Sequence, residues 1–154
     1  MYRPRFSAVV LAVACTAATV LAQEQRIRRS DLPAAVQKTV DQESKGATVR
    51  GFSKETEHGQ TIYEAELTAK GRSKDISVDA NGKVVEIEEE VPADSLTDAV
   101  KQGLQDEAGN GKIGKVESLT KSGRLVAYEA KVTTGTKKSE IQVGPDGKRL
   151  AHEE

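Results

Sequence analysis

A pattern in the first half of the chain returns in the second half, and this duplication constrains the fold more than any other feature. Residues 63–90 read YEAELTAKGRSKDISVDANGKVVEIEEE, and residues 128–154 read YEAKVTTGTKKSEIQVGPDGKRLAHEE. Both copies open with Tyr-Glu-Ala, carry an Ile-x-Val pair and turn at Asn-Gly or Asp-Gly, at a constant offset of 65 residues. Such an internal repeat predicts two copies of one structural unit.

A helical pattern precedes each copy. Apolar residues recur at helical spacing over residues 32–40, and the same stripe returns over residues 96–104 at an offset of 64. The change of offset from 64 to 65 predicts one extra residue near residues 125–127, in a turn or a β-bulge.

Strand patterns follow each helix. Tyr63, Ala65 and Leu67 alternate with Glu64 and Glu66, which predicts a strand with one apolar and one polar face. Short turns between consecutive strands favour an antiparallel meander. We therefore expect an α+β protein of two tandem repeats, each one helix followed by a four-stranded antiparallel meander, with the helix packed on one face of the sheet.

The first 22 residues have the layout of a secretory signal peptide. Arg3 and Arg5 precede an uncharged run at residues 6–21, and small residues precede an expected cut after Ala22. The run is shorter than the ~20 apolar residues that a membrane-spanning helix needs. We expect an exported protein, periplasmic or secreted, with no membrane attachment after cleavage. Lipid attachment at Cys15 is the alternative.

The repeats set the remaining boundaries. Residues 23–31 show no apolar periodicity and are expected to form a flexible lead-in, followed by repeat 1 at residues 32–91 and repeat 2 at residues 92–154. Each repeat has about 60 residues, a size at which a single hydrophobic core is marginal. We therefore expect the two repeats to support each other.

Charge and cysteine content exclude several classes of function. The whole chain has a formal net charge of −1, and removing the two arginines of residues 1–22 makes it −3. This balance predicts no nucleic-acid partner and no polybasic membrane patch. Since Cys15 is the one cysteine, the mature chain has no thiol for redox chemistry or for zinc.

The sequence offers few groups for catalysis. His58 lies beside Gly59 in an expected turn, and His152 lies close to the last residue, so a solvated imidazole is the favoured interpretation of both. The chain shows no Gly-rich phosphate loop, nucleophile elbow or histidine–carboxylate cluster. We expect a protein that is not an enzyme and that uses no cofactor and no catalytic metal.

An acidic run follows the first hairpin turn at residues 86–90, EIEEE. Such charges are typical of an edge strand, which they keep soluble and protect from pairing. Weak cation binding is the alternative, although the sequence shows no oxygen cage of the kind that calcium requires.

The segments Leu32-Pro33-Ala34-Ala35-Val36, YEAEL and ISVDANGKVVEIEEE resemble the PepSY-like domain, and a tandem pair of such units resembles the β-lactamase-inhibitor-like fold. The resemblance covers residues 32–154, and its motifs are structural. It implies a binding module, because the family is thought to include members that regulate or inhibit peptidases. The second copy departs from the pattern at Gly144, where the strand-end Asp is expected.

Strand alternation also predicts a candidate binding face on the side of the sheet away from the helices. Its residues are Glu64, Glu66, Ser77, Glu86, Glu88, Glu129, Lys131 and Gln142. Tight interfaces are usually centred on Trp, Tyr or Arg, so binding through this face should be weak or driven by charge.

The expected function is that of an exported, non-enzymatic PepSY-like binding module. Its expected partner is a protein, a peptidase or another envelope protein that it inhibits or regulates. The alternative is a periplasmic sensor or carrier of cations or small ligands, which would use the acidic surface of the sheet.

Overall fold

The computed structural model describes residues 24–57, 59–152 and 154. The expected signal peptide, Cys15 and His58 lie outside the described residues. The elements, in chain order, are β1 (Gln25–Ile27), the 3₁₀ turn η1 (Arg29–Asp31), α1 (Ala34–Glu43), β2 (Ala47–Glu57), β3 (Gln60–Ala69), β4 (Arg72–Asp79), β5 (Val84–Glu90), the 3₁₀ turn η2 (Ala93–Ser95), α2 (Asp98–Ala108), β6 (Lys112–Lys121), β7 (Arg124–Thr134) and β8 (Lys137–Val143).

The strands form one sheet rather than two. It is an eight-stranded sheet in the order β1 to β8, and every neighbouring pair is antiparallel. Although the protein is α+β, the prediction of two tandem units, each a helix with its own four-stranded meander, is wrong. The two halves merge because β5 pairs with β6, from Glu86 opposite Lys121 to Glu90 opposite Glu117.

The halves also differ in their strands. A short strand, β1, pairs with β2 at Ile27 opposite Phe52, within the segment expected to be a flexible lead-in. The second half has three strands after its helix, and the residues that follow β8 make an isolated bridge between Val143 and Arg149. The counterpart of β5 at residues 149–152 reads RLAH and lacks β-branched residues, so its preference for a strand is weak.

The acidic strand is an interior strand. β5 lies between β4 and β6, so the interpretation of the acidic run as an edge is wrong. Its charges are partly compensated across strands, since Lys121 Nζ lies 3.3 Å from Glu86 Oε2 and Lys74 Nζ lies 3.0 Å from Glu89 Oε1.

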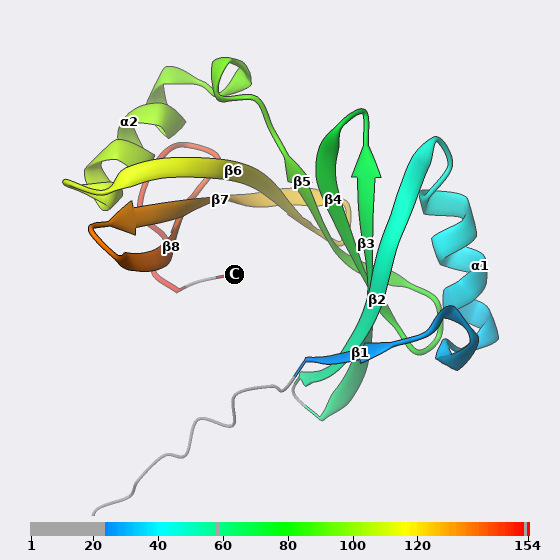
Figure 1. Cartoon of the computed structure of the whole chain (residues 1–154). Helices are drawn as coiled ribbons and strands as arrows, with labels where there is room; N and C mark the ends of the chain where they lie inside the picture. The colour runs from blue at the N-terminus through cyan, green and yellow to red at the C-terminus, as the bar shows by residue number, and fades with distance from the viewer. Residues whose placement is uncertain (1–23, 58, 153) are drawn as a thin grey trace, which may run out of the picture.

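Both helices cover the same side of the sheet. Val36 and Val40 of α1 are buried against the strands of the first half, and Val100 and Leu104 of α2 are buried against those of the second half. The sheet curves, and the helices lie on its outer side (Figure 1). We call the opposite, polar side the inner face.

In each half, a turn packs closely against the helix. Gly82 and Gly147 adopt φ values of +85° and +78°, which favour glycine. A Cβ at Gly82 would lie 2.8 Å from the carbonyl oxygen of Ala35, and one at Gly147 would collide with that of Ala99. The same close contact between turn and helix therefore occurs in both halves.

The extra residue predicted near residues 125–127 is a β-bulge, which confirms that prediction. Leu119 lies opposite Ala127, while the next residue, Thr120, lies opposite Leu125, so Val126 has no partner in the register. In the part of the chain that the structure describes, no helix is long and apolar enough to span a membrane.

Candidate functional site

The sheet register arranges the inner face in rows of side chains that run across the strands. In the first row, Glu64 of β3 lies opposite Ser77 of β4, Ser77 lies opposite Glu86 of β5, and Glu86 lies opposite Lys121 of β6. Since side chains directly opposite each other on one face are neighbours, the structure brings the predicted residues Glu64, Ser77 and Glu86 together and adds Lys121, which was not predicted.

A second row lies beside the first. Glu66 of β3 lies opposite Asp75 of β4, Asp75 lies opposite Glu88 of β5, and Glu88 lies opposite Leu119 of β6. Glu66 is compensated, because Arg26 of β1 forms an ion pair with it. Asp75 and Glu88 therefore form a carboxyl pair in the middle of the face.

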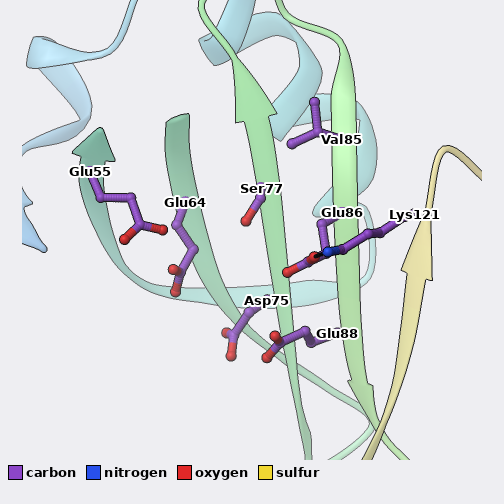
Figure 2. Close-up of a pocket in the computed structure, with 8 residues that line it drawn as sticks. All are labelled: Glu55, Glu64, Asp75, Ser77, Val85, Glu86, Glu88 and Lys121. Carbon is purple, nitrogen blue, oxygen red and sulfur yellow. Dashed lines mark ion pairs between the residues drawn. The ribbon is translucent and has the colours of Figure 1, made fainter. Parts of the chain in front are cut away.

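The two rows surround an acidic hollow. It has a volume of about 370 Å³. Figure 2 shows its eight lining residues: Glu55, Glu64, Asp75, Ser77, Val85, Glu86, Glu88 and Lys121. Five of the eight are acidic and one is a lysine, so the hollow concentrates negative charge.

Burial alters the acidity of these side chains. Burial first, and then repulsion from Asp75, raises the pKa of Glu64 to about 7. Burial and then repulsion from Glu86 and Glu117 raise the pKa of Glu88 to about 8. The pKa of Asp75 is also raised, chiefly by burial and then by Glu117. Within the described part of the chain, neither Glu64 nor Glu88 has an ion-pair partner.

An ion pair with a buried carboxylate lies beside the hollow. The Nζ atom of Lys115 lies 2.6 Å from Oε1 of Glu117 and 3.0 Å from the hydroxyl oxygen of Ser73. The side chain of Glu117 is only 4% exposed. Carboxylate oxygens of Asp75, Glu88 and Glu117 all lie within 4.8 Å of one another. Because Lys115 already supplies the compensating charge at Glu117, we assign no metal ion to this group.

The predicted residues of the second half are paired within the sheet. Gln142 donates a hydrogen bond of 2.9 Å to Glu129, and Lys131 Nζ lies 3.1 Å from Oε1 of Glu140. Burial raises the pKa of Glu129 although the bond from Gln142 opposes it. Glu129 accepts this hydrogen bond but has no ion pair within the described residues, so the uncompensated carboxyl groups of the inner face lie mainly on β3, β4 and β5, with Glu129 on β7.

Sequence reasoning missed five charged residues in and beside the hollow: Glu55, Asp75, Lys115, Glu117 and Lys121. The signal for Asp75 was present, since it lies two residues before Ser77 and alternation places both on one face. For the three residues of β6 no such signal exists, because their proximity to β5 depends on a pairing between the two halves.

His152 lies apart from the acidic hollow. It is exposed, and it lines a separate hollow with Glu107 and Arg149. His152 therefore lies outside the set of carboxyl groups that the register brings together.

Comparison with known proteins identifies the fold. No family model matches the chain, and neither does any curated protein. Among solved structures, a BLIP-like protein from Bacteroides fragilis matches with a TM-score of 0.57 at 23% identity, over 77% of this chain and 83% of that one. The fold is BLIP-like, that is, β-lactamase-inhibitor-like.

Two further structures have the same BLIP-like fold. A DUF2874 family protein from Bacteroides ovatus matches with a TM-score of 0.60 at 21% identity, over 77% of this chain and 84% of that one. A protein from Bacteroides eggerthii, provisionally named as periplasmic, also matches. Its TM-score is 0.63 at 17% identity, over 77% of this chain and 86% of that one. The similarity is one of fold, and the PepSY-like resemblance stays a prediction.

Proposed function

We propose that this chain is an exported, non-enzymatic binding module that docks a basic surface of another protein on the inner face of its sheet. The partner class is a peptidase or another envelope protein, which the module inhibits or regulates. The periplasmic name of one structural neighbour and the BLIP-like name of another support this proposal, as does the signal-peptide layout of residues 1–22.

The observation that carries the proposal is the uncompensated acidity of the inner face. Glu64, Asp75 and Glu88 are each partly buried, and no ion pair compensates them within the described residues. Desolvated carboxylates are unfavourable unless a cation or a hydrogen-bond donor satisfies them. A lysine or arginine of a partner, entering the hollow, would supply the missing charge.

The composition of the face indicates how such a partner would be held. None of the residues lining the hollow is a Trp, Tyr or Arg, which are the usual anchors of tight interfaces. Attraction between opposite charges would therefore dominate, and salt would weaken it because the Debye length is ~10 Å at 0.1 M salt and ~3 Å at 1 M.

Capture from an envelope extract tests the proposal when a matched variant is included. The mature chain and the double variant Glu64→Gln/Glu88→Gln would be immobilised side by side and washed at 50 mM and 500 mM salt. We expect a partner that the mature chain retains at low salt, and that the double variant retains at least about tenfold less well.

The control is the double variant Glu43→Gln/Asp94→Asn, which removes two exposed carboxylates at the end of α1 and in η2. It should capture the partner as well as the unchanged chain does. Equal capture by all three proteins, or capture that 500 mM salt leaves unchanged, would count against docking on the inner face.

Sensing or carrying cations or small ligands is the second candidate, and the acidic hollow is the observation that favours it. A ligand that binds the folded state raises the melting temperature. Thermal melting with and without millimolar calcium therefore separates the candidates, and an unchanged melting temperature would eliminate calcium as the cation.

A further inference from the structure

The carboxyl groups of Asp75 and Glu88 face each other across two adjacent strands. They are direct partners in the register of β4 and β5. Figure 2 shows their oxygens pointing toward one another within the hollow, and both belong to the group whose oxygens lie within 4.8 Å of one another. The strand pairing thus holds two acidic groups at close range.

The nearest positive charge belongs to a different group. Lys115 Nζ lies 2.6 Å from Glu117, and the two form an ion pair in which the carboxylate side chain is 4% exposed and the lysine side chain is 30% exposed. With Lys115 engaged there, Asp75 and Glu88 have no ion-pair partner within the described residues.

The other charged groups around the pair are mostly acidic, and those that are compensated have partners of their own. Glu66 pairs with Arg26, Glu86 pairs with Lys121, and Glu90 accepts a hydrogen bond from the backbone N–H of Ser73. The titratable and charged groups that face the pair are Glu64 and Glu66 from β3, Glu86 and Glu90 from β5, Lys115, Glu117 and Lys121 from β6, and Glu129 from β7.

Two carboxylates at this range repel each other strongly, and the second ionisation is disfavoured. We propose that Asp75 and Glu88 share one proton at neutral pH, and that the loss of this proton at higher pH switches on the full negative charge of the inner face. The second half of this inference rests on the proposed docking function, whereas the first half does not.

The acidity of the two groups agrees with this geometry. Burial and like charges raise the pKa of Glu88 to about 8, and burial and Glu117 raise that of Asp75. Because the groups interact, the protons leave in steps that belong to the pair rather than to one residue. The pair therefore gains about one negative charge between pH 6 and pH 9, as one carboxylic acid releases its proton to the solvent. Glu64 on the same face, whose pKa burial raises to about 7, releases a second proton over this range.

Carboxyl ¹³C NMR tests the shared proton directly. Uniformly labelled protein would be titrated from pH 4 to pH 10, with signals assigned through the variants Asp75→Asn and Glu88→Gln. We expect one titration step of the pair above pH 7. In either variant the remaining carboxyl should titrate at least about one unit lower, because its charged neighbour is gone.

If Asp75 and Glu88 both titrate below pH 6, the shared proton is overturned. The same holds if the remaining carboxyl does not move when its neighbour is neutralised.

Binding of a basic probe tests the consequence for docking. The probe is a ten-residue peptide of alternating lysine and alanine with both ends blocked, measured by fluorescence anisotropy at pH 6.0 and 8.5 at fixed ionic strength. Both proteins compared carry Glu64→Gln, because Glu64 titrates over the same range. We expect binding to Glu64→Gln to tighten about five- to tenfold between these pH values, and binding to Glu64→Gln/Glu88→Gln to change less than about twofold.

The two measurements separate two kinds of failure. A high titration step combined with pH-independent peptide binding would overturn the switch. A high titration step with no peptide binding at either pH would leave the shared proton standing and count against the proposed docking function.

Discussion

Glu117 is a charged residue in a buried position, and the ion pair with Lys115 compensates its charge. The Lys115–Glu117 contact of 2.6 Å, with Ser73 as a further partner of both, satisfies a carboxylate that is 4% exposed. Removing one member of such a pair leaves an uncompensated buried charge, which is far worse than having no pair at all.

Replacing Lys115 by Met should therefore lower the free energy of unfolding by about 3 kcal/mol. Urea unfolding monitored by circular dichroism measures this change. The matched control is Lys112→Met on the same strand, where the lysine is exposed, and its effect should stay within about 0.5 kcal/mol. The double variant Lys115→Met/Glu117→Gln should recover part of the loss, and equal losses in the single and double variants would contradict the pairing.

The half-buried carboxyls also predict how stability depends on pH. The pKa values of Glu64 and Glu88 are raised to about 7 and about 8 by folding, so the folded chain holds protons that the unfolded chain has already released. Their stabilising contribution is complete below about pH 4.5 and is lost as pH rises through the folded-state pKa values.

The free energy of unfolding should therefore fall between about pH 5 and about pH 9 and level off above that range. Urea titrations at intervals of half a pH unit would show this decline. In Glu64→Gln/Glu88→Gln the decline should be much smaller, because glutamine does not titrate. A stability that rises from pH 5 to pH 8 would contradict the assignment of these groups.

At the scale of residues, alternation along a strand was sufficient to predict which side chains share a face. Glu64, Ser77 and Glu86 lie on one face because each alternates with apolar residues, and the register of the strands places them in one row. Alternation says nothing about which strand lies alongside, so the proximity of Glu117 to Glu88 could not be predicted. Of the carboxyl pair in the hollow, Glu88 was predicted, and Asp75 was missed although the same alternation places it on this face.

At the scale of elements, hairpin turns are fixed to helices through glycines. Gly82 has φ +85° and would place a Cβ 2.8 Å from the carbonyl oxygen of Ala35. Gly71 has a similar φ of +81° in the turn between β3 and β4, but a Cβ there meets nothing within 4 Å. Comparing substitutions at the two glycines therefore separates the cost of backbone strain from the cost of a collision with the helix.

Gly71→Ala should cost about 1 kcal/mol through strain at positive φ. Gly82→Ala should cost about 2 kcal/mol more, because the added methyl group collides with the backbone of α1. Thermal or urea unfolding of the two variants measures the difference. If the two substitutions cost the same, the turn between β4 and β5 does not press on the helix as the structure shows.

The elements themselves were largely predictable, whereas their assembly was not. Helical spacing placed α1 and α2, and the Asn81-Gly82 and Asp146-Gly147 turns placed the hairpins, because these signals are local. The acidic strand β5 was interpreted as an edge because charges are typical of edges. Its true neighbour, β6, lies beyond a whole helix in the sequence, and no local pattern reports it.

At the scale of the whole molecule, one sheet joins both halves. β5 and β6 pair over five residues on each strand, and Leu119 on the inner side of β6 is 1% exposed. A half of about 60 residues has a marginal core, so loss of this pairing should strongly destabilise each half.

Expressed separately, residues 23–91 and residues 92–154 should therefore each fail to show a cooperative urea transition, while the joined chain shows one. Circular dichroism of the three proteins at equal concentration measures this. A cooperative transition in either isolated half would mean that the sheet is two domains placed side by side.

The central claim is that the inner face of this sheet, at β3 to β5, is where another protein docks. Amide chemical-shift mapping tests it most directly, by titrating the labelled chain with the partner captured from the envelope extract. We predict the largest shifts at and beside Glu64, Asp75 and Glu88, with those of α1 unchanged. Chemical-shift changes concentrated on the helices, with no changes on the inner face, would contradict the claim.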